Sequence, residues 1–161
     1  GLNLANDAIR SVEKAVSLEK DNMEFLYVLA ELYAKSNRFA DAVAAFEKVI
    51  HSDYNNADVW LDYAELRAKN NDNDAAIALI TKAIRLFPGE SLLVYRLAAY
   101  RFNAGRIKES IRTLEKALIL DYDKHIEIFS FAPEMIELPE VYDLIESLRP
   151  VRIQKQRKRQ Q

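Results

Sequence analysis

Apolar residues recur at spacings of three and four along most of the chain, which is the pattern of amphipathic helices, and short polar breaks separate these segments. The chain matches itself at a shift of 34 residues. Residues 23–56 and 57–90 agree at 10 of 34 positions, and residues 91–124 continue in the same register without a gap. Each unit holds two amphipathic segments, so the pattern predicts a row of helical hairpins and an all-α fold.

Positions within the unit divide into small and large side chains. Small residues let two helix axes approach closely, and we expect the larger ones to fill the gaps that remain. The eighth, twentieth and twenty-seventh positions carry Ala30, Ala64 and Ala98, then Ala42, Ala76 and Ser110, then Val49, Ala83 and Ala117. The fourth, seventh and twenty-fourth positions carry Leu26, Trp60 and Val94, then Leu29, Tyr63 and Leu97, then Phe46, Ile80 and Leu114.

Each unit also contains a predicted break between its two helices. The fifteenth position holds Asn37, Asn71 and Gly105, which are residue types that tolerate the left-handed conformation at a helix end. Pro88 marks a second stop at the end of the middle unit, where Tyr54 and Tyr122 stand in the neighbouring units. The first helix of every unit should therefore end at the fifteenth position.

Over residues 1–124 the sequence resembles the tetratricopeptide repeat family, whose 34-residue unit has the pattern Trp-x-x-Leu-Gly-x-x-Tyr followed by Ala, Phe and Pro. The resemblance implies a right-handed superhelical solenoid of antiparallel helix pairs. Arg67 and Arg101 depart from the pattern, which has Tyr there, and the preceding Leu66 and Tyr100 are expected to supply the missing apolar contact. The matching residues are Trp60, Tyr63, Ala64, Ala76, Ile80, Ala83 and Pro88 in the middle unit, and Leu29, Ala30, Tyr33, Ala42 and Phe46 in the first.

The two ends of the repeat region differ from its middle. Residues 1–22 match the second helix of a further unit whose first helix is missing, which indicates a fragment or a damaged unit. The missing helix would leave an open edge, and copies of the chain could associate through it. Residues 125–148 lose the register because Pro133 and Pro139 interrupt them. We expect residues 125–148 to form capping helices that cover the open core of the last repeat.

The charge of the chain is unevenly distributed. Of its 161 residues, residues 1–148 hold 17 Lys and Arg against 25 Asp and Glu, while residues 149–161 hold six basic residues and no acidic one. We interpret residues 149–161 as a disordered, solubilising tail, because it lacks the aromatic residues that stack on bases. Binding of nucleic acid by this tail is the less favoured alternative.

Candidate chemistry is sparse. The chain has no cysteine, no membrane-length apolar run and no phosphate-binding or nucleophile motif, and its two histidines, His51 and His125, lie far apart. We therefore expect no catalytic residue, no metal and no cofactor. A cytoplasmic location is expected for this segment, although a longer parent chain could be anchored elsewhere.

The family resemblance implies a concave surface, lined chiefly by the first helices, that binds a protein or peptide. The acidic residues of this surface should favour basic groups in the ligand, and Lys35 and Lys69 should weaken that preference. The chaperone-tail adaptors of the family use a clamp of Lys and Asn that this sequence lacks. The residues at the lining positions are Glu24, Tyr27, Glu31, Lys35, Asp58, Leu61, Glu65, Lys69, Leu92, Tyr95, Ala99, Phe102 and Asn103.

Two interpretations of the aromatic residues stay open. Tyr27, Tyr95 and Phe102 are either available to a ligand or packed against neighbouring helices and the cap. The first interpretation predicts a protein-interaction scaffold, which is our leading hypothesis. The alternative is a structural or regulatory arm of a larger protein, with no peptide-binding groove of its own.

Overall fold

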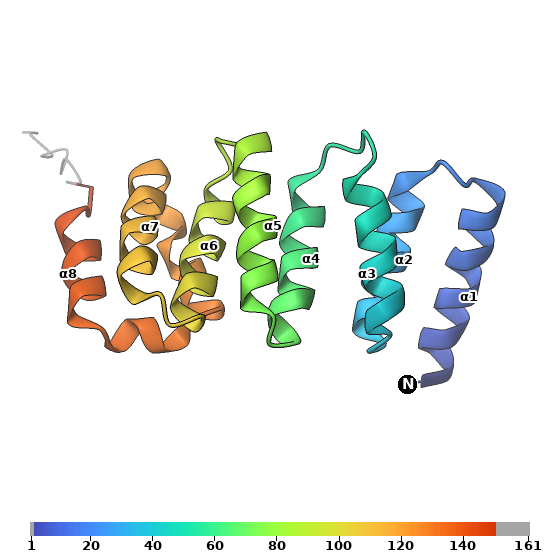
Figure 1. Cartoon of the computed structure of the whole chain (residues 1–161), viewed down its shortest axis with the longest axis horizontal. Helices are drawn as coiled ribbons and strands as arrows, with labels where there is room; N and C mark the ends of the chain where they lie inside the picture. Colours follow the sequence, from blue (N-terminus) through green and yellow to red (C-terminus); the bar gives the residue numbers. More distant parts are fainter. Residues whose placement is uncertain (1, 151–161) are drawn as a thin grey trace, which may run out of the picture.

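Helical hairpins stand side by side in a row, with α1 at one end and α8 at the other (Figure 1). The computed structural model describes residues 2–150. No strand occurs among those residues, and the predicted all-α class is confirmed. The helices are α1 (Leu2–Leu18), α2 (Met23–Lys35), α3 (Phe39–Ile50), α4 (Ala57–Lys69), α5 (Asn73–Leu86), α6 (Ser91–Asn103), α7 (Ile107–Leu120), the 3₁₀ segments η1 (Tyr122–Ser130) and η2 (Pro133–Glu137), and α8 (Pro139–Ser147).

The predicted stops between the paired helices are confirmed. Asn37, Asn71 and Gly105 have φ angles of 57°, 61° and 76°, so all three adopt the left-handed conformation two residues after the last residue of α2, α4 and α6. At the opposite ends, Asn22, Asn56 and Asp72 cap α2, α4 and α5, because each side chain accepts a hydrogen bond from a backbone N–H of the first turn. Local sequence thus sets both the start and the end of several helices.

Small residues lie where the helices cross, as the repeat pattern predicts. Small side chains at these positions let the axes of neighbouring helices approach closely. Each of the nine has an exposed fraction of 0%: Ala30, Ala42, Val49, Ala64, Ala76, Ala83, Ala98, Ser110 and Ala117.

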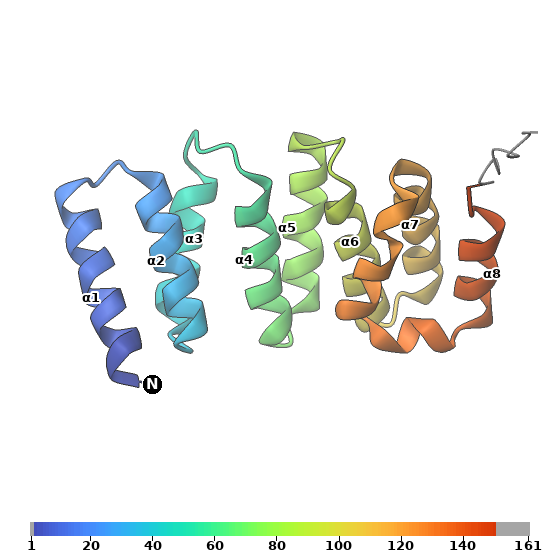
Figure 2. The same ribbon diagram turned by 180° about the vertical axis from the view of Figure 1, so that it is seen from behind.

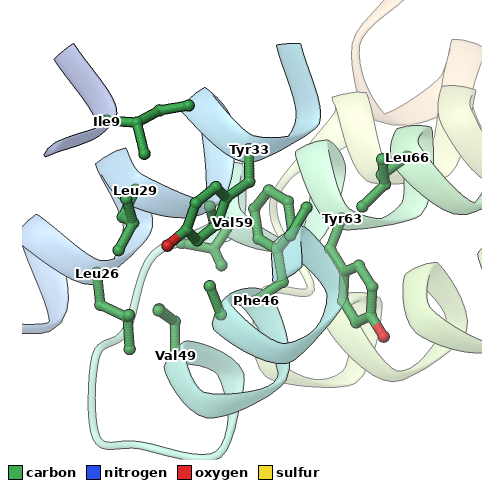
Figure 3. Close-up of a cluster of buried hydrophobic side chains, with 12 residues drawn as sticks. Ile9, Leu26, Leu29, Tyr33, Phe46, Val49, Val59, Tyr63 and Leu66 are labelled. Atoms are coloured by element: carbon green, nitrogen blue, oxygen red, sulfur yellow. The ribbon is translucent and has the colours of Figure 1, made fainter. Parts of the chain in front are cut away.

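The core runs along the row as three adjoining clusters. In the first cluster, Phe46 of α3 stacks on Tyr63 of α4 with ring centroids 5.3 Å apart, and Ile9 of α1 closes the end (Figure 3). The open edge expected at residues 1–22 would leave the apolar residues of α1 partly uncovered. Ile9 is instead 2% exposed because α1 packs on α2, whereas Val12 and Val16 are only partly buried against the cluster.

The C-terminal segment is irregular because prolines interrupt it. Pro133 and Pro139 each begin a new helical segment, so the chain turns twice between η1 and α8. Its side chains continue the core: Ile128, Ala132, Met135 and Val141 are 0% exposed and pack with residues of α6 and α7. The expectation for residues 149–161 remains a prediction, since residues 151–161 lie outside the described part of the chain.

Candidate functional site

The first helices of the three units, α2, α4 and α6, form the side of the molecule that we call the concave surface. Figure 2 shows this side, with η1 lying across α6 and α7. The residues predicted to line a groove all come from these three helices. Their exposure differs, however, between the part of the surface on α2 and α4 and the part on α6.

The α6 part of the concave surface is covered by the C-terminal segment. Tyr95 is 1% exposed and its hydroxyl donates a hydrogen bond to the Asp121 carbonyl at 2.7 Å. Asn103 donates from Nδ2 to the Phe131 carbonyl at 2.8 Å, and Phe102 packs partly buried in the same cluster. Here the second interpretation of the aromatic residues is correct, because η1 folds back along α6.

For three of the predicted lining residues the prediction is therefore wrong. Tyr95 and Ala99 are buried beside the C-terminal segment, and Leu61 is buried in the cluster between α4 and α6, with 6% of its surface exposed. None of them presents a surface to a partner. The mapping from unit positions missed this because it assumed an uncovered first helix in every unit.

The α2 and α4 part of the concave surface has a polar contact at its centre. The Tyr27 hydroxyl donates to Asp62 Oδ2 at 2.5 Å and joins the first helices of two successive units. Asp62 was absent from the predicted set because it stands at the sixth position of the unit. The repeat alignment contained a signal for Asp62. The sixth position carries Val28 in the preceding unit and Arg96 in the following unit, so the packing of the repeat does not require a charged residue there.

Burial dominates the electrostatics of this contact. It raises the pKa of Asp62, and the nearby charges of Glu65 and Asp58 add to the effect, whereas the hydrogen bond from Tyr27 and the charge of Arg96 oppose it. Burial also raises the pKa of Tyr27, followed by its hydrogen bond to Asp62. A half-buried carboxylate with acidic neighbours is stabilised by an additional cation or hydrogen-bond donor.

Glu65 connects the same region to the covered part of the surface. Its Oε1 lies 2.6 Å from Lys69 Nζ, and its Oε2 lies 3.4 Å from Arg96 Nη1. The Arg96 guanidinium also lies over the Phe131 ring, 3.3 Å from the centroid. Arg96 is thus held between an acid of α4 and an aromatic residue that follows η1.

A hollow of about 230 Å³ opens between α2 and α4 beside Asp62. Its floor contains apolar side chains and its rim contains carboxylates, and Lys35 Nζ lies 3.8 Å from Glu31 on the same helix. Glu24 and Asp58 are exposed at the starts of α2 and α4, and Leu92 is partly buried at the start of α6. The residues around the hollow are Glu31, Ala34, Lys35, Phe46, Asp62, Glu65, Leu66 and Lys69.

Groups suited to catalysis or metal binding are scattered. Among residues 2–150, no set of three or more His, Asp or Glu side chains could together hold a metal ion. His51 Nδ1 lies 2.7 Å from the Glu47 carbonyl at the end of α3, and His125 Nδ1 lies 2.8 Å from the Tyr122 carbonyl within η1. No helix of this part of the chain has the length and hydrophobicity needed to cross a membrane.

Comparisons with known proteins agree with this architecture. A model of the tetratricopeptide repeat family matches residues 2–50 and 27–91. No curated protein matches the chain by sequence. A crystal structure of MamA is similar to the chain with a TM-score of 0.70 and 20% identity, covering 89% of this chain and 86% of that one.

Two further solved structures have the same fold. MamA from Desulfovibrio magneticus RS-1 has a TM-score of 0.66 and 19% identity, covering 89% of this chain and 85% of that one. YrrB, described as having an unusual peptide-binding site, has a TM-score of 0.65 and 16% identity, covering 94% and 81%. Because the family model matches more than half of its residues, the chain belongs to the tetratricopeptide repeat family, whose members are generally non-enzymatic scaffolds for protein interactions.

Proposed function

We propose that this protein is an interaction scaffold that binds a peptide segment of a partner on the concave surface between α2 and α4. The observation that carries the proposal is the hollow beside Asp62. This hollow is open, whereas the α6 part of the concave surface is covered by the C-terminal segment. The fold similarity to YrrB, a protein described as having a peptide-binding site, supports a peptide as the class of ligand.

The bound segment places a basic side chain against Asp62 and Glu65. Both carboxylates line the hollow, and the raised pKa of Asp62 means that its charge is poorly solvated where it stands. A guanidinium or ammonium group from the partner provides a counter-charge and hydrogen bonds to Asp62, whereas Glu65 already pairs with Lys69 and Arg96. Phe46 and Leu66 give the stem of that side chain an apolar surface to cover.

Binding to a peptide array tests this proposal. Labelled protein should select peptides rich in Arg and Lys, and Asp62→Asn together with Glu65→Gln should weaken that binding about tenfold or more. Asn at position 62 still accepts the Tyr27 hydrogen bond, so the fold is retained. The matched control is Glu115→Gln, which neutralises an exposed carboxylate on α7, on the other side of the molecule.

The outcomes separate the alternatives. Equal loss in the Glu115→Gln control, or selection of acidic peptides, would contradict the proposed site, because general charge would then explain the binding. Circular dichroism of each variant verifies that the helices are intact. Salt should weaken the specific binding only moderately, since the contact is partly buried.

A structural arm is the second candidate function. The observation that favours it is the cover over α6, which hides Tyr95 and Ala99 and shortens the accessible groove. In that case the array selects no peptide on the concave surface. The chain then acts by spacing or positioning the segments attached to it.

A further inference from the structure

A second groove lies on the opposite side of the molecule, between the second helices α5 and α7, with α6 as its floor. We call it the convex groove. It has a volume of about 620 Å³, against 230 Å³ for the concave hollow. Its lining comprises Thr81, Ile84, Arg85, Pro88, Val94, Leu97, Arg101, Thr113, Lys116, Ile119 and Leu120.

The preceding unit provides an internal comparison. A smaller groove of about 350 Å³ lies between α3 and α5, and most of its lining residues correspond to those of the convex groove at a shift of 34. Trp60 and Tyr63 form its floor, where the convex groove has Val94 and Leu97. The convex groove is larger, in agreement with the replacement of two aromatic side chains by aliphatic ones at the same unit positions.

The charge also changes between the two grooves. The smaller groove contains Glu47, which accepts a hydrogen bond from the Tyr63 hydroxyl, and the equivalent residue in the convex groove is the uncharged Thr81. His51 is likewise replaced by Arg85. The lining of the convex groove therefore holds basic residues and no acidic one.

The basic residues of the convex groove differ in whether they pair with an acidic residue. Arg101 donates from Nη1 to Thr113 Oγ1 at 2.6 Å, and its Nε lies 3.6 Å from Glu109 Oε2. Within residues 2–150, neither Arg85 nor Lys116 forms an ion pair. Two cations at the rim thus keep their charge available to a bound group.

Large apolar side chains stand exposed beside these cations. Ile119 is 70% exposed and Leu120 is 45% exposed, and both line the groove above the buried Leu97. An aliphatic surface with a basic rim is complementary to a segment that carries aliphatic or aromatic side chains next to carboxylates. The chain's own basic tail is excluded as the occupant, because residues 149–161 contain no acidic residue.

We propose that the convex groove binds an acidic amphipathic segment of a partner protein. Its apolar side chains cover the exposed Ile119 and Leu120, and its carboxylates pair with Arg85 and Lys116. This surface is separate from the concave hollow and favours the opposite charge. The two sides of the scaffold therefore bind chemically different segments, and each proposal can fail without the other.

Selection from a random peptide display library tests the proposal. The full chain is the target, and the counter-target is the double variant Thr81→Glu with Leu97→Tyr, which recreates the Glu47 and Tyr63 pair of the preceding unit. Peptides retained by the wild type alone should be enriched in Asp and Glu next to Leu, Ile or Phe. A synthetic selected peptide should then shift the methyl resonances of Ile119 and Leu120.

A second variant, with changes only at the surface, tests the convex groove even if the double variant misfolds. Arg85→Glu with Lys116→Glu changes only exposed charges and should weaken a selected peptide at least about tenfold. Asp62→Asn with Glu65→Gln, on the concave surface, should leave its affinity unchanged. Enrichment of basic peptides, no enrichment at all, or methyl shifts caused by self-association without peptide would each overturn the proposal.

Discussion

At the scale of single residues, buried tyrosines connect successive helices through their hydroxyl groups. Tyr33 of α2 donates to Glu13 of α1 at 2.7 Å, and Tyr63 of α4 donates to Glu47 of α3. Each ring packs in the core while its hydroxyl reaches an acceptor at the edge. A phenol held in this way resists ionisation, because the phenolate would be poorly solvated and would face a carboxylate.

Alkaline pH should therefore destabilise the protein. Burial, followed by the hydrogen bond to Glu13, raises the pKa of Tyr33 from 10.0 to about 12, and the pKa of Tyr63 is also raised. Because the folded pKa exceeds the unfolded one, the contribution to stability is complete below pH 10 and is lost as pH rises through about 12. Urea unfolding at several pH values measures this. A free energy of unfolding that stays constant between these pH values would contradict it.

At the scale of helices, the ends of the first helices depend on one backbone conformation. Gly105 has a φ angle of 76°, and nothing lies within 4 Å of the position that a Cβ would occupy. A side chain there meets backbone strain without any steric clash from neighbours. Asn37 and Asn71 perform the same turn in the other units, since Asn tolerates this conformation better than most residues.

Two glycines allow a matched test of this strain. Gly105→Ala should lower the free energy of unfolding by about 1–2 kcal/mol, because alanine disfavours a positive φ. Gly89→Ala should instead be neutral or stabilising by up to about 1 kcal/mol, because Gly89 lacks a positive φ and has open space around it. Urea denaturation followed by circular dichroism compares the two. Equal effects would mean that the φ angle is irrelevant.

At the scale of the whole molecule, each helix packs mainly on its immediate neighbours, so stability is built along the row. The C-terminal segment closes one end, and Met135 is completely buried against α6 and α7. The same segment hides Tyr95 and so decides how much of the concave surface is accessible. Closing the core and shortening the groove are two consequences of a single packing arrangement.

Disturbing this end should have a local effect. Met135→Ala removes a buried side chain and should cost about 2–5 kcal/mol. Hydrogen exchange should show faster opening of α6, α7 and α8, whereas α2 and α3 at the other end keep their protection. The control is Ile136→Ala, which alters a side chain with an exposed fraction of 66%. Uniform loss of protection along the chain would show that it unfolds as one unit.

Much of the fold and part of the candidate site could be predicted from local pattern. The 34-residue repeat identified the crossing residues such as Ala64 and the turns at Asn71 and Gly105, because helix periodicity and turn chemistry act within one unit. Glu31 and Glu65 were placed in the predicted groove by the family resemblance, and both line the hollow. Asp62 was missed because unit positions ignore contacts between units.

The sequence by itself determined the repeating hairpin, since small and large residues recur at positions that only paired helices can pack. Only the tertiary structure decided which surfaces remain open. The irregular segment after residue 121 folds back over α6 and buries Tyr95, and the shift from Trp60 and Tyr63 to Val94 and Leu97 opens the convex groove. Both depend on how helices of different units and the C-terminal segment pack against one another, which the periodicity within one unit does not encode.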